Sequence, residues 1–333
     1  MPGDLTEVTE IATALGMIAP DLPTALGARP ATLVGVGDEV WARLAERYDG
    51  GTHRESFETA FGNGRAFLYA TDGLRLRAPV RVEWKGPHNP PGDDVIPADL
   101  RVDHVFLVSC KYLSRVLSNP GPSRLFDRLL VGDERSTVNW FLETAPLEFQ
   151  RLYVAARSHL DAANLPERVE DLTRDGQRRL MVGLAARQWP EPLTEPWADL
   201  CAAVATASAQ RWERAMQAPR DTLRLLWRLL RITTATYFVL GTDRDAHLRL
   251  RIDSAWDWAQ AFELVRFEVA PRHAGQAEVG WTAVVRRRAD GADIAVEGHV
   301  EVRWSHGRFL GAPEAKVYLD TPHRQVPGYH PLT

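Results

Sequence analysis

The chain has 333 residues, of which 45% are hydrophobic and 25% charged, and its formal net charge is −4. This composition is typical of a globular protein with a substantial core, and the length predicts about two domains. The net negative charge argues against a surface that binds polyanions everywhere, and two cysteines are too few for a disulfide framework or a four-cysteine zinc site. Because signal-peptide features and apolar runs of roughly 20 residues are both lacking, we expect a cytoplasmic protein without a membrane partner.

The first part of the sequence predicts helices followed by strands. In chain order we expect helices and turns in residues 1–50, a helix over 53–61, a strand over 74–84, a proline-rich loop over 85–99, a strand over 99–112 and a short helix over 113–119. Thr52 and Glu55 have the spacing of a capping box at the start of the second helical region. The segment over 74–84 alternates with period two, which is the pattern of a half-buried strand, and the segment over 99–112 is the most strand-like run of the chain.

The remainder predicts helices and then an antiparallel sheet. Apolar residues recur at helical spacing in five segments, namely 123–131, 138–163, 167–187, 196–217 and 220–234. From residue 236 onward the pattern is that of strands, with a hairpin turn at the Asp-Gly pair within residues 288–293. We therefore expect an α/β (α+β) protein in three parts: an N-terminal helical segment over 1–50, a core over 51–165, and a helical and antiparallel β-sheet region over 166–333.

Lysine is rare in this sequence: of 40 Lys and Arg residues, only Lys85, Lys111 and Lys316 are lysine. Both residue types solubilise a surface, but only lysine offers a compact, titratable ammonium group beside a water or a metal ligand. Each lysine is therefore a candidate for a chemical role, and the alternative is that three surface lysines remain by chance. We interpret Lys316, which follows Glu314 at i+2, as part of an ion pair at a strand edge.

The other two lysines lie at the ends of the two predicted strands. Side chains i and i+2 of a strand point to the same face, so Glu83 and Lys85 share one face and Ser109 and Lys111 share one. Asp99 begins the strand that leads to Lys111. The sequence thus predicts carboxylates and a lysine close together on one sheet.

Over roughly residues 52–119, this arrangement resembles the PD-(D/E)xK, or restriction-endonuclease-like, nuclease superfamily. In that family a helix carries an acid, an Asp begins a strand, and the next strand carries an acid-x-Lys motif followed by a helix. The resemblance implies a restriction-endonuclease-like mixed-sheet core, Mg²⁺ or Mn²⁺ as cofactor, DNA as partner, and a restriction or bacterial defence role. A palindromic DNA target would require a homodimer.

Carried over residue by residue, Asp99 matches the strand Asp, Lys111 matches the motif lysine, and Glu58 or Glu55 matches the helix acid. The sequence departs from the pattern because Ser109 stands where the family has Glu or Asp. Glu83 on the neighbouring strand could supply that carboxylate. The metal ligands expected from the resemblance are therefore Asp99, Glu83 and Glu58.

Two alternatives to this alignment remain. Asp103 lies on the same strand and competes with Asp99 for the position of the strand Asp. Asp72, Glu83 and Lys85 form a second D-x10-ExK pattern, although a proline-rich loop follows it instead of a helix. Each of these residues could also be an ordinary solvated strand or turn residue.

The chemistry explains why such residue types would be grouped. Hydrolysis of a phosphodiester needs an activated water and neutralisation of charge on the phosphoryl oxygens. Carboxylates can hold Mg²⁺, which keeps several waters and binds phosphate, and a bound metal lowers the pKa of its water. A nearby lysine ammonium stabilises the hydroxide and the charge of the transition state.

Arginines predict the DNA contacts. One face of the expected helix over 220–234 carries four arginines, namely Arg220, Arg224, Arg228 and Arg231, and a second group precedes the hairpin turn, namely Arg286, Arg287 and Arg288. Guanidinium groups in a row can follow a phosphate backbone. The alternative is an ordinary amphipathic helix with a solvated face.

Three functions are therefore compared: a metal-dependent DNA endonuclease, a non-catalytic module of the same fold that binds nucleic acid or a protein, and a small-molecule enzyme with Lys111 or Lys85 as base. The resemblance favours the first. The serine at position 109 favours the second, because it breaks the metal motif. No cofactor signature supports the third.

Overall fold

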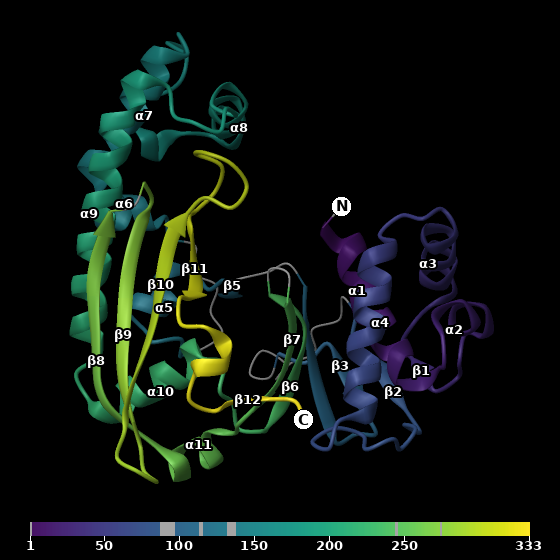
Figure 1. Ribbon diagram of the computed structural model, residues 1–333. Coiled ribbons are helices and arrows are strands. Elements are labelled where there is room, and N and C mark those ends of the chain that lie inside the picture. Colours follow the sequence, from purple (N-terminus) through teal and green to yellow (C-terminus); the bar gives the residue numbers. More distant parts are fainter. Residues whose placement is uncertain (1, 87–96, 113–115, 132–137, 244–245, 274) are drawn as a thin grey trace. The chain divides into compact units, whose positions relative to one another are not determined.

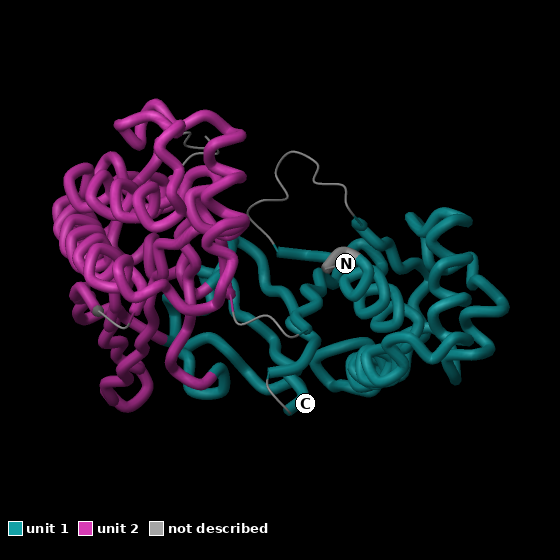
Figure 2. Tube along the Cα trace, turned by 90° about the horizontal axis from the view of Figure 1, so that it is seen from above, with its two compact units in different colours: residues 1–115, 231–261, 323–333 teal, residues 116–230, 262–322 magenta. Residues whose placement is uncertain are grey.

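The computed structural model describes residues 2–86, 97–112, 116–131, 138–243, 246–273 and 275–333 (Figure 1). The chain forms two compact units (Figure 2). Unit 1 comprises residues 1–115, 231–261 and 323–333, and unit 2 comprises residues 116–230 and 262–322. These units differ from the three consecutive parts expected from the sequence, because the chain enters unit 2 twice and returns to unit 1 each time.

Unit 1 contains a seven-stranded mixed sheet. In spatial order its strands are β1 (Leu33–Val34), β2 (Val82–Trp84), β3 (Leu100–Val102), β4 (Phe106–Lys111), β6 (Tyr237–Asp243), β7 (Ala246–Ile252) and β12 (Tyr329–Pro331). The pairs β1–β2 and β4–β6 are parallel, and the other neighbours are antiparallel. The helices of this unit are α1 (Pro2–Ile18), α2 (Leu22–Ala28), α3 (Asp38–Asp49), α4 (Arg54–Tyr69), α11 (Ala255–Ala261) and the 3₁₀ helix η2 (His323–Gln325).

The core of unit 1 lies between the sheet and the helices α1 and α4, which pack side by side (Figure 1). α1 is buried around most of its circumference from Val8 to Met17, as expected for a helix with apolar residues on all sides. Two glycines allow its close contact with α4. A Cβ on Gly16 would overlap the carbonyl oxygen of Phe61, and a Cβ on Gly64 would overlap that of Thr13.

We expect Gly64→Ala to lower the free energy of unfolding by about 1–3 kcal/mol, because the added methyl group must push α1 and α4 apart. Gly62 lies on the same helix with nothing within 4 Å of a Cβ built there, and it is the matched control. Gly62→Ala should be neutral or stabilise by up to about 1 kcal/mol, since alanine favours a helix more than glycine does. Urea unfolding of both variants tests this. Equal effects at the two positions would contradict the close packing of the helices.

Unit 2 contains a five-stranded antiparallel sheet with helices on one side (Figure 1). In spatial order its strands are β5 (Val116–Ser118), β11 (Glu314–Leu319), β10 (Asp293–Arg303), β9 (Ala277–Arg287) and β8 (Phe262–His273). Its helices are α5 (Pro122–Phe126), α6 (Trp140–Thr144), α7 (Pro146–His159), the 3₁₀ helix η1 (Val169–Asp171), α8 (Arg174–Gly183), α9 (Glu191–Ala215) and α10 (Pro219–Leu229). α9 packs along β8 and β9, and buried aromatic side chains such as Trp212 and Trp281 fill the space between them.

The predicted α/β class is confirmed, with a mixed sheet in unit 1 and an antiparallel sheet formed mainly by the C-terminal part of the chain. The strand predicted over 74–84 is wrong in its first part, because Arg75 and Leu76 have positive φ angles and only residues 82–84 pair as a strand. The helix predicted over 113–119 is wrong at residues 116–118, which form β5 and pair with β11. Residues 87–96 of the predicted loop lie outside the described residues.

Among the described residues, no single helix has the length and apolar character needed to cross a membrane. The helices Asp4–Ile18 and Leu22–Ala28, bent by 98° relative to each other, meet that criterion as a pair by length and composition only.

Candidate active site

Asp99 lies at the point where three strands of unit 1 meet. Its N–H donates to the carbonyl oxygen of Val108 on β4 (2.8 Å), and its own carbonyl oxygen accepts from the N–H of Lys85 (3.0 Å). Its carboxylate accepts hydrogen bonds from the N–H of Cys110 (2.6 Å) and from the hydroxyl of Ser109 (3.3 Å). The hydroxyl of Ser109 therefore orients the neighbouring carboxylate.

Glu10 on α1 supplies a second buried carboxylate beside Asp99. The indole N–H of Trp84 on β2 donates to Glu10 over 2.7 Å, and only 8% of the residue surface is exposed. The pKa of Glu10 is raised to about 8, chiefly by burial and also by the negative charge of Asp99, although the hydrogen bond from Trp84 and the charge of Lys111 lower it. Glu10 is therefore mostly protonated at neutral pH while no cation is bound.

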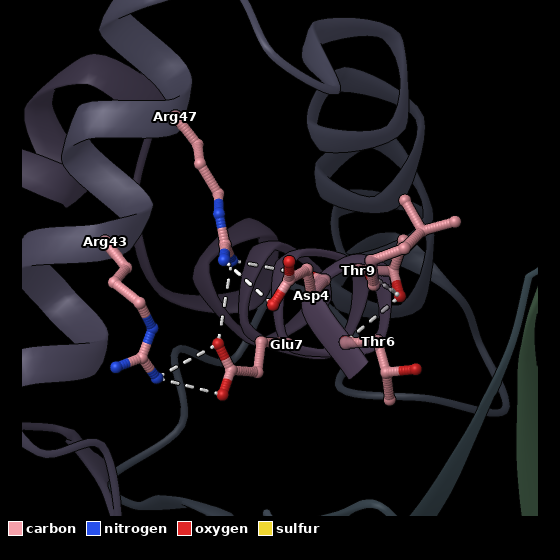
Figure 3. Close-up of polar contacts among 7 residues, drawn as sticks. Asp4, Thr6, Glu7, Thr9, Arg43 and Arg47 are labelled. Atoms are coloured by element: carbon pink, nitrogen blue, oxygen red, sulfur yellow. Dashed lines mark hydrogen bonds and ion pairs between the residues drawn. The ribbon is translucent and has the colours of Figure 1, made fainter. Parts of the chain in front are cut away.

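Ion pairs with α3 hold the N-terminal turns of α1 in place. Arg47 lies 3.0 Å from Asp4 and 3.6 Å from Glu7, and Arg43 lies 3.0 Å from Glu7 (Figure 3). Each pair is partly exposed and contributes little by itself, but together they link two helices through four charged groups. Glu10 follows Glu7 by nearly one helical turn, so these contacts help to fix its position.

Two lysines surround Asp99, and they are not equivalent. Burial raises the pKa of Asp99, and the hydrogen bond from the Cys110 N–H, the charge of Lys111, the hydroxyl of Ser109 and the charge of Lys85 all lower it. Lys111 acts on Glu10 as well as on Asp99. The arrangement therefore brings two buried carboxylates and one ammonium group, Lys111, within electrostatic range of one another.

A buried polar network fixes the strand end that carries Lys111. The hydroxyl of Tyr112 lies 2.9 Å from that of Thr13 on α1, and it accepts a hydrogen bond from the amide of Asn63 on α4 (3.1 Å). The same amide donates to the carbonyl oxygen of Gly241 on β6 (2.9 Å), and the Asn63 oxygen accepts from Arg249 (2.8 Å). Because Thr13 lies one helical turn beyond Glu10, this network links the helix that carries the second acid to the strand that carries Lys111.

Three acids that the sequence assigned to the site have other partners. Glu83 forms ion pairs with Arg101 (2.5 Å) and Arg81 (3.1 Å); the hydrogen bond from Arg101 lowers its pKa most. Asp103 accepts the N–H groups of residues 80 and 81 in a turn, where its φ is 50°. Glu58 is exposed and pairs with Arg54 one helical turn away (3.3 Å). Glu83 and Glu58 are thus paired with arginines, and the carboxylate that interacts electrostatically with Asp99 is that of Glu10.

Asp72 and Glu55, the remaining candidates, have other partners or are exposed. Asp72 accepts a hydrogen bond from the Thr333 hydroxyl (3.4 Å) and lies 4.0 Å from Arg251. Asp72 and Glu83, the two acids of the second alignment, therefore contact different residues in the structure. Glu55 is exposed in the first turn of α4.

The two buried carboxylates that interact electrostatically in this region are those of Glu10 and Asp99. In the described ranges, no group of three His, Cys, Asp or Glu side chains could hold a metal ion. Mg²⁺ keeps several waters and is commonly bound through one or two carboxylates together with substrate phosphates, so two buried carboxylates fit this ion.

No match to this chain was found among models of protein families, curated proteins or solved structures.

The predicted rows of arginines are interrupted in the structure. α10 ends at Leu229, and Arg231 has a φ of 56°, so it does not continue the face formed by Arg220, Arg224 and Arg228. Arg228 donates to the carbonyl oxygen of Leu129 over 2.7 Å instead of projecting freely. Each arginine of the second group is paired with a nearby acid, as follows: Arg286 with Asp293, Arg287 with Asp290, and Arg288 with Glu263. Arg220 and Arg224 are exposed and remain the candidates for phosphate contacts, although Arg224 lies 4.0 Å from Asp221.

Proposed function

We propose that the chain is a metal-dependent nuclease with a restriction-endonuclease-like core in unit 1, and that it hydrolyses phosphodiester bonds of DNA. The observation that carries this proposal is the grouping of two buried carboxylates, Glu10 and Asp99, with Lys111. Such groups are costly to bury, and acids with raised pKa values beside a lysine are typical of functional sites.

The order of elements also supports the core that we propose. α1 carries an acid and packs on the sheet, Asp99 precedes β3, and the antiparallel strand β4 ends at Lys111. β4 then pairs in parallel with β6 after a long crossover. This sequence of helix, acid, strand and lysine corresponds to the family pattern, except that β5 follows where the family has a helix.

In this proposal Glu10 and Asp99 would hold Mg²⁺ or Mn²⁺, and Ser109 would keep the Asp99 carboxylate in its orientation. The bound ion would supply a water of lowered pKa and neutralise charge on a phosphoryl oxygen. The ammonium of Lys111 would orient the attacking water and stabilise the negative charge that develops on the phosphate. Burial would strengthen each of these interactions by excluding water.

Incubation with plasmid DNA in Mg²⁺, in Mn²⁺ and in EDTA tests this proposal. Nicking or linearisation in either metal, its absence in EDTA, and its loss in Asp99→Ala would support a nuclease. DNA that is retarded in a gel but intact under all conditions would instead support a non-catalytic binding module. Ser109 favours that second candidate, since it leaves the site with two carboxylates instead of three.

A further inference from the structure

One edge of the unit 2 sheet is formed by its longest strand. β8 has 12 residues and pairs with β9 on one side (Figure 1). Among the described residues, no backbone hydrogen bond reaches the other side of residues 263–270. A hollow of about 480 Å³ borders residues 267–270, with Glu213 and Met216 of α9 in its wall. The outward N–H and C=O groups of β8 therefore form a template on which a further strand can add.

The sequence and register of β8 limit the part that is available for pairing. A β-bulge lies between Leu264 and Arg266, and from Arg266 onward the strand runs in regular register with β9. Pro271 has no N–H to donate, so the available segment ends at Ala270. The midpoint of residues 264–270 is Phe267. Two copies of the chain that pair antiparallel about this midpoint would use the same residues of each copy, as a two-fold interface requires.

The charges of this segment decide which antiparallel pairing is favourable. The side chains of Arg266 and Glu268 are 61% and 59% exposed and lie 3.1 Å apart. A two-fold axis at residue 266 would place two arginines directly opposite each other, and an axis at residue 268 would do the same with two glutamates. An axis at Phe267 instead places Arg266 of each copy opposite Glu268 of the other. Because like charges directly opposite are destabilising and opposite charges stabilise a strand pair, the axis at Phe267 is favoured.

We propose that β8 pairs antiparallel with β8 of a second copy of this chain, about a two-fold axis at Phe267. The pairing joins the two five-stranded sheets and forms two intermolecular ion pairs between Arg266 and Glu268. Val265, which is 45% exposed, lies beside Val269 of the second copy and is removed from water. The self-complementary order of charges is the reason for a second copy as the occupant. This surface belongs to unit 2, goes beyond the proposed function of the unit 1 carboxylates and does not rest on it.

Sedimentation velocity of the full chain over a range of concentrations tests this pairing. The wild-type protein should show a monomer–dimer equilibrium. Arg266→Glu and Glu268→Arg should each raise the dissociation constant of the dimer by about tenfold or more, because two attractive pairs become repulsive. An equimolar mixture of these two variants should dimerise like the wild type, since every cross-strand pair again joins opposite charges. The double variant, which exchanges the two charges within one chain, should do so as well.

Arg178→Glu is the matched control, because Arg178 on α8 is 60% exposed and also forms an ion pair with a nearby acid. It should dimerise like the wild type, and thermal unfolding checks that every variant is folded. Loss of the dimer in both single variants and its return in the mixture would support the pairing. A wild-type chain that stays monomeric would overturn it, as would a folded single variant that dimerises as tightly as the wild type or a mixture that stays monomeric. Because neither DNA nor metal is present, the result is independent of the proposed nuclease activity.

Discussion

Glu10→Gln should lower metal-dependent DNA cleavage by at least about 10²–10³-fold while leaving the protein folded, in the range found when one group that stabilises transition-state charge is removed. The amide has the shape of the carboxyl group and can still accept the hydrogen bond that Trp84 donates over 2.7 Å. It lacks the negative charge that would hold a divalent cation. Lys111→Ala should cause a loss of similar size, because it removes the ammonium group that interacts with Glu10 and Asp99.

Glu83→Gln is the matched control for this experiment. The sequence assigns Glu83 the ligand position that we propose for Glu10, and Glu83 is neutralised by Arg101 and Arg81. Initial rates of plasmid cleavage in saturating Mg²⁺ should therefore be nearly unchanged in this variant. A large loss in Glu83→Gln together with full activity in Glu10→Gln would show that the wrong acid has been assigned.

The part of the site that is local in sequence could be predicted from the sequence alone. Asp99 directly precedes β3, and Ser109 and Lys111 lie on β4, which a short turn joins to β3. Strand periodicity places the side chains of Ser109 and Lys111 on the same face. Their spacing therefore carries information about their contacts. The hydrogen bond from Ser109 to Asp99 is a direct consequence of this antiparallel pairing.

Glu10 could not be found in the same way, because it reaches the site only through the packing of α1 on the sheet. Nearly ninety residues separate it from Asp99, and no periodic pattern links the two. One signal was present in the sequence: Glu10 precedes the apolar run IATALGMI, so a helix formed there would carry a carboxylate into the core. A charge carried into the core in this way is costly unless it is paired or neutralised.

The other wrong predictions concern where a helix ends and which residues pair as a strand. Arg231 continues the helical spacing of Arg220, Arg224 and Arg228 in the sequence, but α10 ends at Leu229 before reaching it. The residues 74–81 alternate like a strand, yet their backbone turns at Arg75 and Leu76. In both cases tertiary contacts decide the backbone conformation, and local spacing does not record them.

The second large effect concerns the stability of the metal-free protein, which should fall as the pH rises from about 5 to about 8. The pKa of Glu10 is about 8 in the folded chain, well above its ordinary value of 4.5. In this pH window the folded state holds a proton that the unfolded state has lost, so the free energy of unfolding decreases with rising pH. The stabilisation is fully present below about pH 4.5 and is lost as the pH passes through about 8. Burial raises the pKa of Asp99 in the same direction.

The expected loss between these two pH values is on the order of 3 kcal/mol, since one pKa unit corresponds to about 1.4 kcal/mol. Urea unfolding in EDTA at a series of pH values measures it. Glu10→Gln should flatten most of the slope, match the wild type near pH 5 and exceed its stability near pH 8, because a neutral amide replaces a carboxylate that is costly to ionise in the core.

Glu83→Gln is the control for this pH dependence, because the pKa of Glu83 is shifted in the opposite direction to that of Glu10. The hydrogen bond and charge of Arg101 hold the pKa of Glu83 below its ordinary value, so its contribution to stability is present above about pH 4.5 and is lost only in acid. This variant should therefore keep the wild-type slope between pH 5 and 8. A wild-type protein with constant stability over this range would mean that Glu10 is ionised at little cost. Such a result would remove the main physical reason for regarding this buried carboxylate as a group kept for cation binding.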